Sequence, residues 1–237
     1  MRPTFSFFVL TFALLIVTTQ SGFGQDKISG GSGGFHIGSK FYNTQNYSYF
    51  LEDGVADLNN NLLSIGGEGY MVYKNFMIGG RGFYQGGESR DVAVGSPLQD
   101  SRNYTYSLNG GGGYLTLGYA AYSKNDLLIF PQLGIGIESL SLEKSLNETV
   151  VFEPQESLSA EYSWSSPMLD IGIGADWFPF KNGTKIGLRL GYTISLQRNS
   201  NWSHSGGEFI KSDLPENNLN GFYVNLVIGG GGFTTKN

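Results

Sequence analysis

Apolar and polar side chains alternate along most of this chain with a period of two residues. The clearest case lies between Trp164 and Gln197, where apolar residues occupy every second position from 169 to 177 and again from 186 to 196. The positions between them are polar or small. Successive side chains of a strand point to opposite faces, so this pattern predicts two paired strands and disfavours helices.

Eight segments with this alternating character follow Gly30, at about residues 33–42, 62–73, 76–86, 104–122, 127–142, 163–178, 184–197 and 219–230. Long connections join them at 43–61, 87–103, 143–162 and 198–218. The intervening connections are short, and each contains the dipeptide Lys-Asn, at Lys74-Asn75, Lys124-Asn125 and Lys181-Asn182. Asn accepts the positive φ that tight hairpin turns require, so the recurrence predicts a repeated hairpin.

Alternation of long and short connections places every long loop at one end of the molecule, and every tight turn with both termini at the other. Outer-membrane barrels have this layout, with short periplasmic turns and long external loops. The segment lengths fit the roughly 9 to 11 residues of a tilted membrane strand. We therefore predict an all-β, eight-stranded antiparallel up-and-down transmembrane β-barrel, formed as one domain by residues 25–237.

Charge on the face assigned to lipid tests this prediction, because Arg or Lys at mid-membrane would cost roughly 2 to 4 kcal/mol. None of the outward residues is charged. They are Phe35, Ile37, Phe41, Leu63, Ile65, Met71, Tyr73, Phe76, Ile78, Tyr84, Leu115, Leu117, Tyr119, Leu127, Ile129, Leu133, Ile135, Ile137, Phe222, Val224, Leu226, Ile228 and the apolar residues of 169–177 and 186–196. Aromatic residues beside the short turns predict a periplasmic girdle. These are Tyr73, Phe76, Tyr119, Trp177, Phe178 and Phe180.

The inward positions carry the charges, with four acids, four bases and a histidine. They are His36, Lys40, Glu68, Arg81, Glu138, Asp170, Asp176, Lys185 and Arg189. Glu68 and Arg81 lie symmetrically about the turn Lys74-Asn75, so we expect them directly across the first short hairpin. Eight strands leave an interior that side chains fill. We therefore expect a lumen plugged by paired charges.

The amino terminus has the layout of a secretory signal, with Arg2, an apolar run from about Phe5 to Val17 and small or polar residues through Gly24. We expect cleavage after Gly24, so that 1–24 is a signal peptide and the mature chain reaches the cell outer membrane. No later stretch approaches the roughly 20 apolar residues of a membrane helix. The chain has 237 residues, 36 of them Gly, 15% charged residues and no Cys, and its mean hydropathy is −0.15. Disulfides and lipid attachment through Cys are thus excluded.

Three segments resemble the small outer-membrane β-barrel domains related to the OmpA and OmpX types. Residues 169–178 and 187–192 are similar to their last hairpins, and residues 130–136 to their fifth strand. The resemblance implies an architecture and no chemistry. Many such proteins end on an aromatic residue, whereas Phe233 is followed here by four more residues. No periplasmic domain follows the barrel pattern, so the resemblance does not imply peptidoglycan anchoring.

Candidate chemistry is confined to His204, Ser205 and Glu208 in the fourth long connection. They invite comparison with eight-stranded lipid A deacylases, which use His, Ser and Glu, but adjacent His204-Ser205 departs from the His-x-Ser spacing of that family. A polar loop containing Gly206-Gly207 explains the three residues better, and we expect no enzyme. A metal site at His36 is not expected either, because no second His or Cys is near it and metal sites usually need three or four ligands. We expect no cofactor, since the glycine runs at 110–113 and 229–232 lack the strand, loop and helix of a phosphate site.

The long connections carry more acids than bases, which disfavours nucleic-acid binding. We expect contact with outer-membrane lipid, and with lipopolysaccharide if divalent cations bridge it to the acids. Apolar pieces at 47–51 and 150–152 could extend the strands past the membrane and offer edges to a surface ligand or protein. We expect a monomer with a structural or adhesive role through the external loops. Two alternatives remain open: a narrow porin-like conduit for small or hydrophobic solutes, and a lipid A-modifying enzyme.

Overall fold

The computed structural model describes residues 27–42, 61–94, 102–124, 126–146, 159–180, 183–197, 203–206 and 219–236. The predicted signal peptide, Glu208 and the apolar loop pieces at 47–51 and 150–152 lie outside these described residues. No helix in the described ranges is long and apolar enough to cross a membrane.

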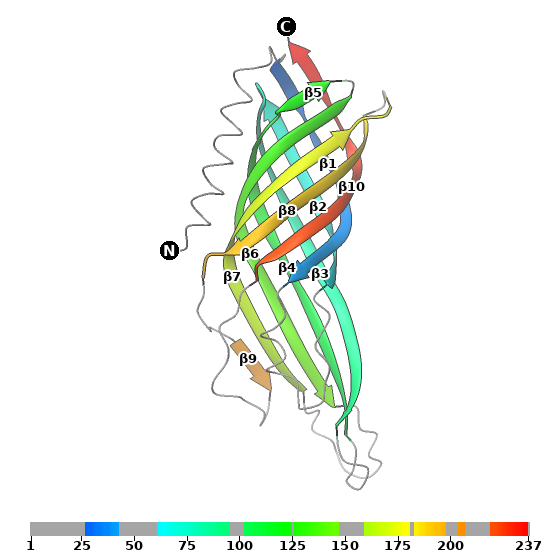
Figure 1. The fold of residues 1–237 in the computed structure, drawn as a ribbon, viewed down its shortest axis with the longest axis vertical. Helices are drawn as coiled ribbons and strands as arrows, with labels where there is room; N and C mark the ends of the chain where they lie inside the picture. The colour runs from blue at the N-terminus through cyan, green and yellow to red at the C-terminus, as the bar shows by residue number, and fades with distance from the viewer. Residues whose placement is uncertain are drawn as a thin grey trace.

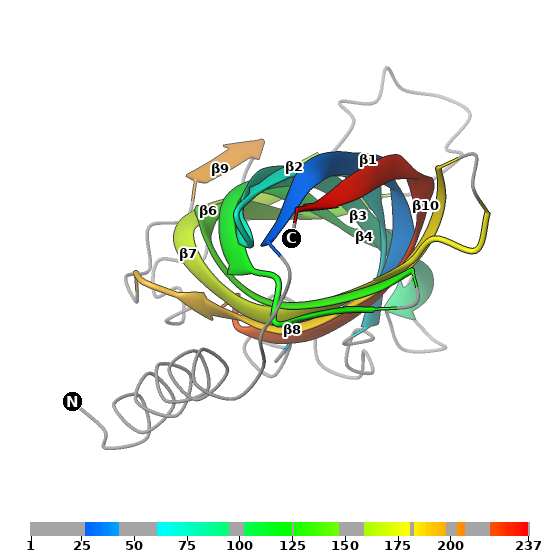
Figure 2. The same cartoon turned by 90° about the horizontal axis from the view of Figure 1, so that it is seen from above.

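Eight long strands form a closed antiparallel barrel, as predicted (Figures 1 and 2). They are β1 (Lys27–Tyr42), β2 (Asn61–Tyr73), β3 (Phe76–Val94), β4 (Arg102–Tyr119), β6 (Leu127–Leu146), β7 (Ser159–Trp177), β8 (Thr184–Ser195) and β10 (Gly221–Lys236). Each pairs with its neighbours in the chain, and β1 pairs with β10 to close the wall. Two short strands add to it: β5 (Tyr122–Lys124) pairs with β6, and β9 (Ser203–Gly206) pairs with β7.

The outer face matches the predicted lipid-facing surface. Every outward residue named from the alternation is exposed or half-buried, and Phe35 and Leu115 are the most exposed of the large apolar side chains, at 80% and 73%. In a water-soluble sheet such residues would face a core. Their exposure around the whole wall forms an uncharged apolar belt of the kind that contacts lipid.

The first short turn has the predicted positive φ at Asn75 (71°), and Lys74 before it also has a positive φ (50°). Asn75 also connects the turn to neighbouring strands through hydrogen bonds. Its Oδ1 accepts one from the Ile28 amide at 2.8 Å, and its backbone carbonyl accepts one from the Ala120 amide at 2.8 Å. In the other two short turns the described positive φ values belong to Asp126 (60°) and Gly183 (83°). The Asn residues of those turns, with Lys181, lie outside the described residues.

Four strands are longer than predicted and continue into the segments predicted as loops at 87–103 and 143–162. The register runs on without a break on β6 and β7, as far as Ser145 opposite Ser159. On β3 and β4 it continues to Val94 opposite Arg102 after one irregularity between Gly86 and Glu88. The prediction ended these strands where outward apolar residues end, but backbone pairing does not depend on that pattern. We call residues 88–94, 102–108, 139–146 and 159–165, with β9, the distal sheet (Figure 1).

Candidate functional site

The distal sheet reverses the polarity of the membrane wall. Along β6 the outward side chains change from Ile135 and Ile137, both 61% exposed, to Ser139, Ser141 and Glu143. The inward ones change in the opposite sense, from the polar Gln132 and Glu138 to the buried Leu140 and Leu142, followed by the buried Lys144. The apolar cluster at this end of the barrel contains Tyr42, Leu62, Tyr106, Leu108, Tyr114, Leu140, Leu142, Tyr162, Trp164, Met168 and Leu219. A sheet with a polar outer face and an apolar inner face is suited to water, so the distal sheet stands beyond the membrane.

The nine predicted charged and histidine residues all point into the barrel. They come from β1, β2, β3, β6, β7 and β8, and each stands at the inward parity of its strand. The side chains of the ion-paired residues among them are at most 8% exposed. The four carboxylates and four cations of this set balance when His36 is neutral, and a fifth cation, Lys144, is buried beyond them in the distal sheet, 5.8 Å from the centre of the Tyr106 ring.

Four of these residues form one cluster near the turn end of the barrel: Glu68, Asp176, Lys185 and Arg189, called here the four-charge cluster. The Arg189 guanidinium donates to Asp176 Oδ1 at 2.7 Å and to Glu68 Oε2 at 3.1 Å, and also pairs with Glu68 Oε1. The Lys185 ammonium lies 3.3 Å from Glu68 and 3.6 Å from Asp176. Each cation therefore contacts both carboxylates, which is the arrangement that offsets the desolvation of buried charges.

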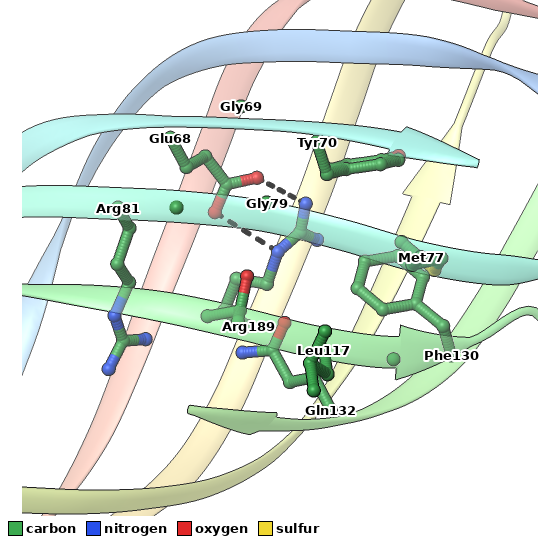
Figure 3. Close-up of a pocket in the computed structure, with 13 residues that line it drawn as sticks. Glu68, Gly69, Tyr70, Met77, Gly79, Arg81, Leu117, Phe130, Gln132 and Arg189 are labelled. Atoms are coloured by element: carbon green, nitrogen blue, oxygen red, sulfur yellow. Dashed lines mark hydrogen bonds and ion pairs between the residues drawn. The ribbon is translucent and has the colours of Figure 1, made fainter. Parts of the chain in front are cut away.

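Arg81 is opposite Glu68 in the β2–β3 register, as the symmetry of the turn predicted. The two side chains nevertheless form ion pairs with other residues and not with each other. The Glu68 carboxylate reaches Arg189 on β8, while the Arg81 guanidinium points away from it (Figure 3) and pairs with Asp170 at 3.3 Å. Side chains in a narrow barrel extend toward the axis, so their partners come from the far wall as readily as from the neighbouring strand.

Three aromatic rings surround the Arg81 guanidinium. Its Cζ lies 4.2 Å from the ring centre of Tyr223, 4.8 Å from that of Tyr114 and 5.8 Å from that of Phe83. Stacking of this kind adds a cation–π attraction to the ion pair with Asp170. The Tyr223 hydroxyl donates to the same carboxylate at 3.3 Å. Arg81 is thus held from several sides at mid-barrel.

Lys40 and Glu138 form the third charged group, closer to the loop end. The Lys40 ammonium bonds both carboxylate oxygens of Glu138, and the Tyr114 hydroxyl donates to Glu138 at 2.6 Å. The Tyr42 hydroxyl donates a hydrogen bond to the side-chain oxygen of Gln85. The centre of the Tyr42 ring lies 4.7 Å from the Lys40 ammonium. Tyr114 therefore contacts both this pair and Arg81, and links the two groups.

An apolar layer closes the turn end of the interior. It is built from Ile28, Val72, Met77, Ala120, Leu128 and Phe130, with Tyr70 and Phe233 packed against it. Phe130 lies 4.9 Å from the Arg189 guanidinium, so this layer touches the four-charge cluster directly. The charged groups are enclosed between this layer and the apolar cluster of the loop end. Sequence reasoning missed both layers, although their residues stand at the inward parity of the same alternating pattern.

Two hollows border the charged residues, one enclosed within the barrel and one, of about 510 Å³, wide open beside Phe35, Glu68 and Arg81. A hollow of about 20 Å³ lies among Glu68, Arg81, Gln132 and Arg189 (Figure 3). That is room for a single water molecule.

His36 faces this interior with both ring nitrogens unpartnered in the described part of the chain. Its ring passes over Gly66, where a Cβ would come within 2.8 Å of His36 Cε1. The described residues include no group of three His, Cys, Asp or Glu that could hold a metal ion. Oδ1 of Asp170 and Oδ1 of Asn225 are also without partners there, and ordered water is the usual partner of such atoms.

Five of the six aromatic residues beside the short turns face outward. Tyr73, Phe76, Trp177 and Phe180 are 66%, 65%, 49% and 60% exposed, and Tyr119 packs edge-on against Phe76 at 5.5 Å. Phe178 differs, because its ring meets Phe233 at 5.2 Å, and Phe233 stacks on the interior residue Tyr70. Phe178 follows the outward Trp177 and so stands at the inward parity, where it extends the apolar layer.

His204 and Ser205 are consecutive residues of β9, and their backbones pair with Tyr162 and Glu161 of β7. Glu208 lies outside the described residues, so the structure leaves the three untested as a site.

Comparison with known proteins found no matching family model and no matching curated protein. Among solved structures, the chain is similar to a major outer membrane protein of Thermus thermophilus, at 10% identity over 87% of this chain and 99% of that one, with a TM-score of 0.45. OprG of Pseudomonas aeruginosa matches at 12% identity over 90% and 98%, with a TM-score of 0.41. Ail of Yersinia pestis, solved with the heparin analogue sucrose octasulfate, matches at 12% identity over 88% and 100%, with a TM-score of 0.39.

The features of this chain itself define its class. Eight antiparallel strands close on themselves, the outer face is an uncharged apolar belt, and exposed aromatic side chains border the belt at the short turns. An even-numbered closed barrel of this kind satisfies every backbone group of its wall within lipid. The chain is an outer-membrane β-barrel protein.

Proposed function

We propose that this protein acts at the cell surface through its distal sheet and external loops, in an adhesive or structural role, and that its barrel is closed to solutes. The observation that carries the proposal is the reversal of polarity between Ile137 and Ser139, above which four strands continue as a water-facing sheet. A barrel that served only to cross the membrane would have no need of this extension.

The interior supports the closed state. The eight charges of its membrane part neutralise one another in three groups, an apolar layer lies at each end, and the hollow beside Arg189 holds about one water. A conduit for hydrophilic solutes needs a continuous hydrated path, and one for hydrophobic solutes would have to pass the buried four-charge cluster.

The edges of the distal sheet suggest how a partner would bind. On one side β9 covers β7 from Ala160 to Ser163. On the other, β3 pairs with β4 up to Val94, while its pairing with β2 ends at Gly86. Residues 88–94 therefore have one strand neighbour within the described chain. An edge of this kind accepts an extended peptide as an added strand.

A trimmed variant tests the proposal. Residues 88–107 would be replaced by Asn-Gly, which joins Gly87 to Leu108, removes the open edge at 88–94 and leaves the apolar belt intact. Cells that express the full chain should aggregate or attach to protein-coated and glycan-coated surfaces, and the trimmed variant should fold, reach the membrane and lose this attachment. Attachment at the full level in the trimmed variant would contradict the proposal.

Planar-bilayer conductance separates this role from transport. We expect the refolded mature chain to be silent, and a defined open level in the wild type would favour a conduit. A lipid-modifying role would require that His204→Ala or Ser205→Ala change the lipid A profile of expressing cells, and we expect no change.

A further inference from the structure

The open hollow of about 510 Å³ lies on the lipid-facing wall over β1, β2 and β3. Glycines at the outward parity of β2 and β3 form its floor: Gly67, Gly69, Gly80 and Gly82. Phe35 of β1 borders the hollow and is directly opposite Gly67 in the strand register. Its side chain is the most exposed of the large apolar residues in the described chain. A protruding ring and a hollow therefore lie side by side on one face of the wall.

The barrel does not need these outward glycines for its own packing. A Cβ at Gly67 would lie 3.7 Å from the nearest atom across the wall, and a Cβ at Gly82 would lie 3.8 Å away, which is ordinary contact. The inward glycines differ, because a Cβ at Gly66 would come within 2.1 Å of the Gly82 carbonyl oxygen. Crowding thus requires glycine inside the barrel but not on its outer wall. The missing outward side chains leave room for a partner outside the barrel.

A second copy of this chain has the shape to fill the hollow. Two barrels inserted in the same direction are related by a two-fold axis along the membrane normal, and such an interface joins one surface patch to the same patch of the partner. The protruding ring and the hollow must therefore lie at nearly the same depth. Phe35 meets this condition because it pairs directly with Gly67 of the floor. A two-fold axis near Gly67 places each Phe35 ring over the β3 glycines of the other copy.

The patch is large enough for a stable pair. Phe35 and the large outward side chains next to the floor are uncharged and at least 50% exposed: Phe35, Ile65, Met71, Ile78, Tyr84 and Leu115. At roughly 100 Å² of exposed surface each, they would bury about 1,200 Å² over two copies, which is the size of a specific interface. Within lipid, small residues let two backbones approach closely and pack. A flexible acyl chain would lose conformational entropy on filling the same hollow, whereas the Phe35 backbone is already fixed in a strand.

We propose that two copies of this protein associate in the outer membrane through β1, β2 and β3, with Phe35 of each copy in the glycine-floored hollow of the other. From the sequence we expected a monomer, but its alternating pattern does not distinguish a wall that contacts lipid from one that contacts a second barrel. The pairing uses the membrane wall and leaves the distal sheet free, so it does not depend on the adhesive role proposed above.

Energy transfer between labelled copies tests the pairing. The chain has no Cys, so one dye can be attached at Ser203→Cys on β9, where the side chain is exposed. Donor-labelled and acceptor-labelled mature chains would be refolded together in phosphatidylcholine vesicles, and transfer would be followed as lipid is added. We expect transfer above that of randomly distributed barrels. Phe35→Ala should weaken association at least about tenfold, because each dimer loses two packed rings.

A second variant and a matched control complete this experiment. Gly67→Leu with Gly82→Leu fills the hollow at positions where the barrel has room for a side chain, so the variant should fold and lose the pairing. Ile173→Ala removes an exposed apolar side chain from β7, four strands away from β2, and should pair as the wild type does.

Cysteine crosslinking locates the contact. Gly67→Cys lies near the proposed two-fold axis and should form a disulfide between copies on oxidation, which requires Cα atoms within about 7 Å of each other. Ile173→Cys on the opposite side of the barrel should not. Random transfer in the wild type would overturn the proposal and leave lipid as the occupant of the hollow. Pairing that survives either Phe35→Ala or the filled hollow, or equal crosslinking at positions 67 and 173, would also overturn it.

Discussion

Arg189→Met tests whether the four-charge cluster holds the interior closed. Methionine keeps much of the length and apolar surface of the side chain beside Phe130, so the change removes charge with little loss of volume. Glu68 and Asp176 then face Lys185 alone. The interior gains one uncompensated negative charge in a place where every described member of the cluster is nearly inaccessible to solvent.

Breaking a buried ion pair by removing one partner typically costs about 3 to 5 kcal/mol. Arg189 contacts both carboxylates through three of its nitrogens, so we expect a loss toward the upper part of this range. A charge-balanced control, Arg189→Met with Asp176→Asn, leaves Glu68 paired with Lys185. Because the two residues share one network, we expect the double variant to regain about 1 to 3 kcal/mol relative to the single one.

The assay is equilibrium urea unfolding in lipid vesicles, followed by tryptophan fluorescence, with bilayer conductance of the same preparations. The single variant should unfold at lower urea and leak, while the double variant should be more stable and quieter. A loss below about 1 kcal/mol for Arg189→Met, or a double variant less stable than the single one, would refute the reasoning that paired charge closes the barrel.

Three further predictions concern other parts of the barrel. Arg81→Ala should make the silent protein leak, and added guanidinium should block the current by occupying the site between Tyr114 and Tyr223; a leak insensitive to guanidinium would argue against that site. Leu115→Arg should destabilise the barrel by about 2 to 4 kcal/mol in vesicles, measured by urea unfolding, because Leu115 is 73% exposed within the apolar belt. Asn75→Ala should lower the free energy of unfolding by about 1 to 3 kcal/mol, because it leaves the Ile28 amide without its hydrogen-bond acceptor. Asn75→Gly should lose less, because glycine accepts the positive φ of this position. Equal losses for the two variants in urea unfolding would show that backbone strain is unimportant there.

The barrel could be predicted correctly from the sequence because the side chains of every membrane strand alternate between the lipid and the interior. Counting alternate positions along the strands places Phe35 on the outer face and Arg81 in the interior, and the structure agrees. The register of Glu68 with Arg81 also followed from the turn. Their actual ion partners did not, because strand pairing fixes neighbours along the wall and carries no information about which side chains meet across the axis.

The distal sheet was mistaken for loops for a related reason. The prediction searched for apolar residues on the outward face, and beyond Ile137 that face becomes polar while Leu140 and Leu142 continue on the other. The alternation is present in the sequence with its sense reversed. A search for period two irrespective of face would have found it.

The ion pairs of the interior also bear on how the chain assembles. Those of Lys40 with Glu138, Arg81 with Asp170, and Glu68 with Arg189 and Lys185 each join the first three barrel strands to the last four in chain order, and their partners are separated by as many as 121 residues. Counted over these ion-paired residues together with Asp176, which pairs with Arg189 and Lys185, the first group carries one excess positive charge and the second one excess negative charge. A half-formed sheet therefore exposes charges to lipid that only the opposite half can neutralise. This makes partial barrels unfavourable in the bilayer and couples the insertion of early strands to that of late ones, so that folding must wait for long-range closure.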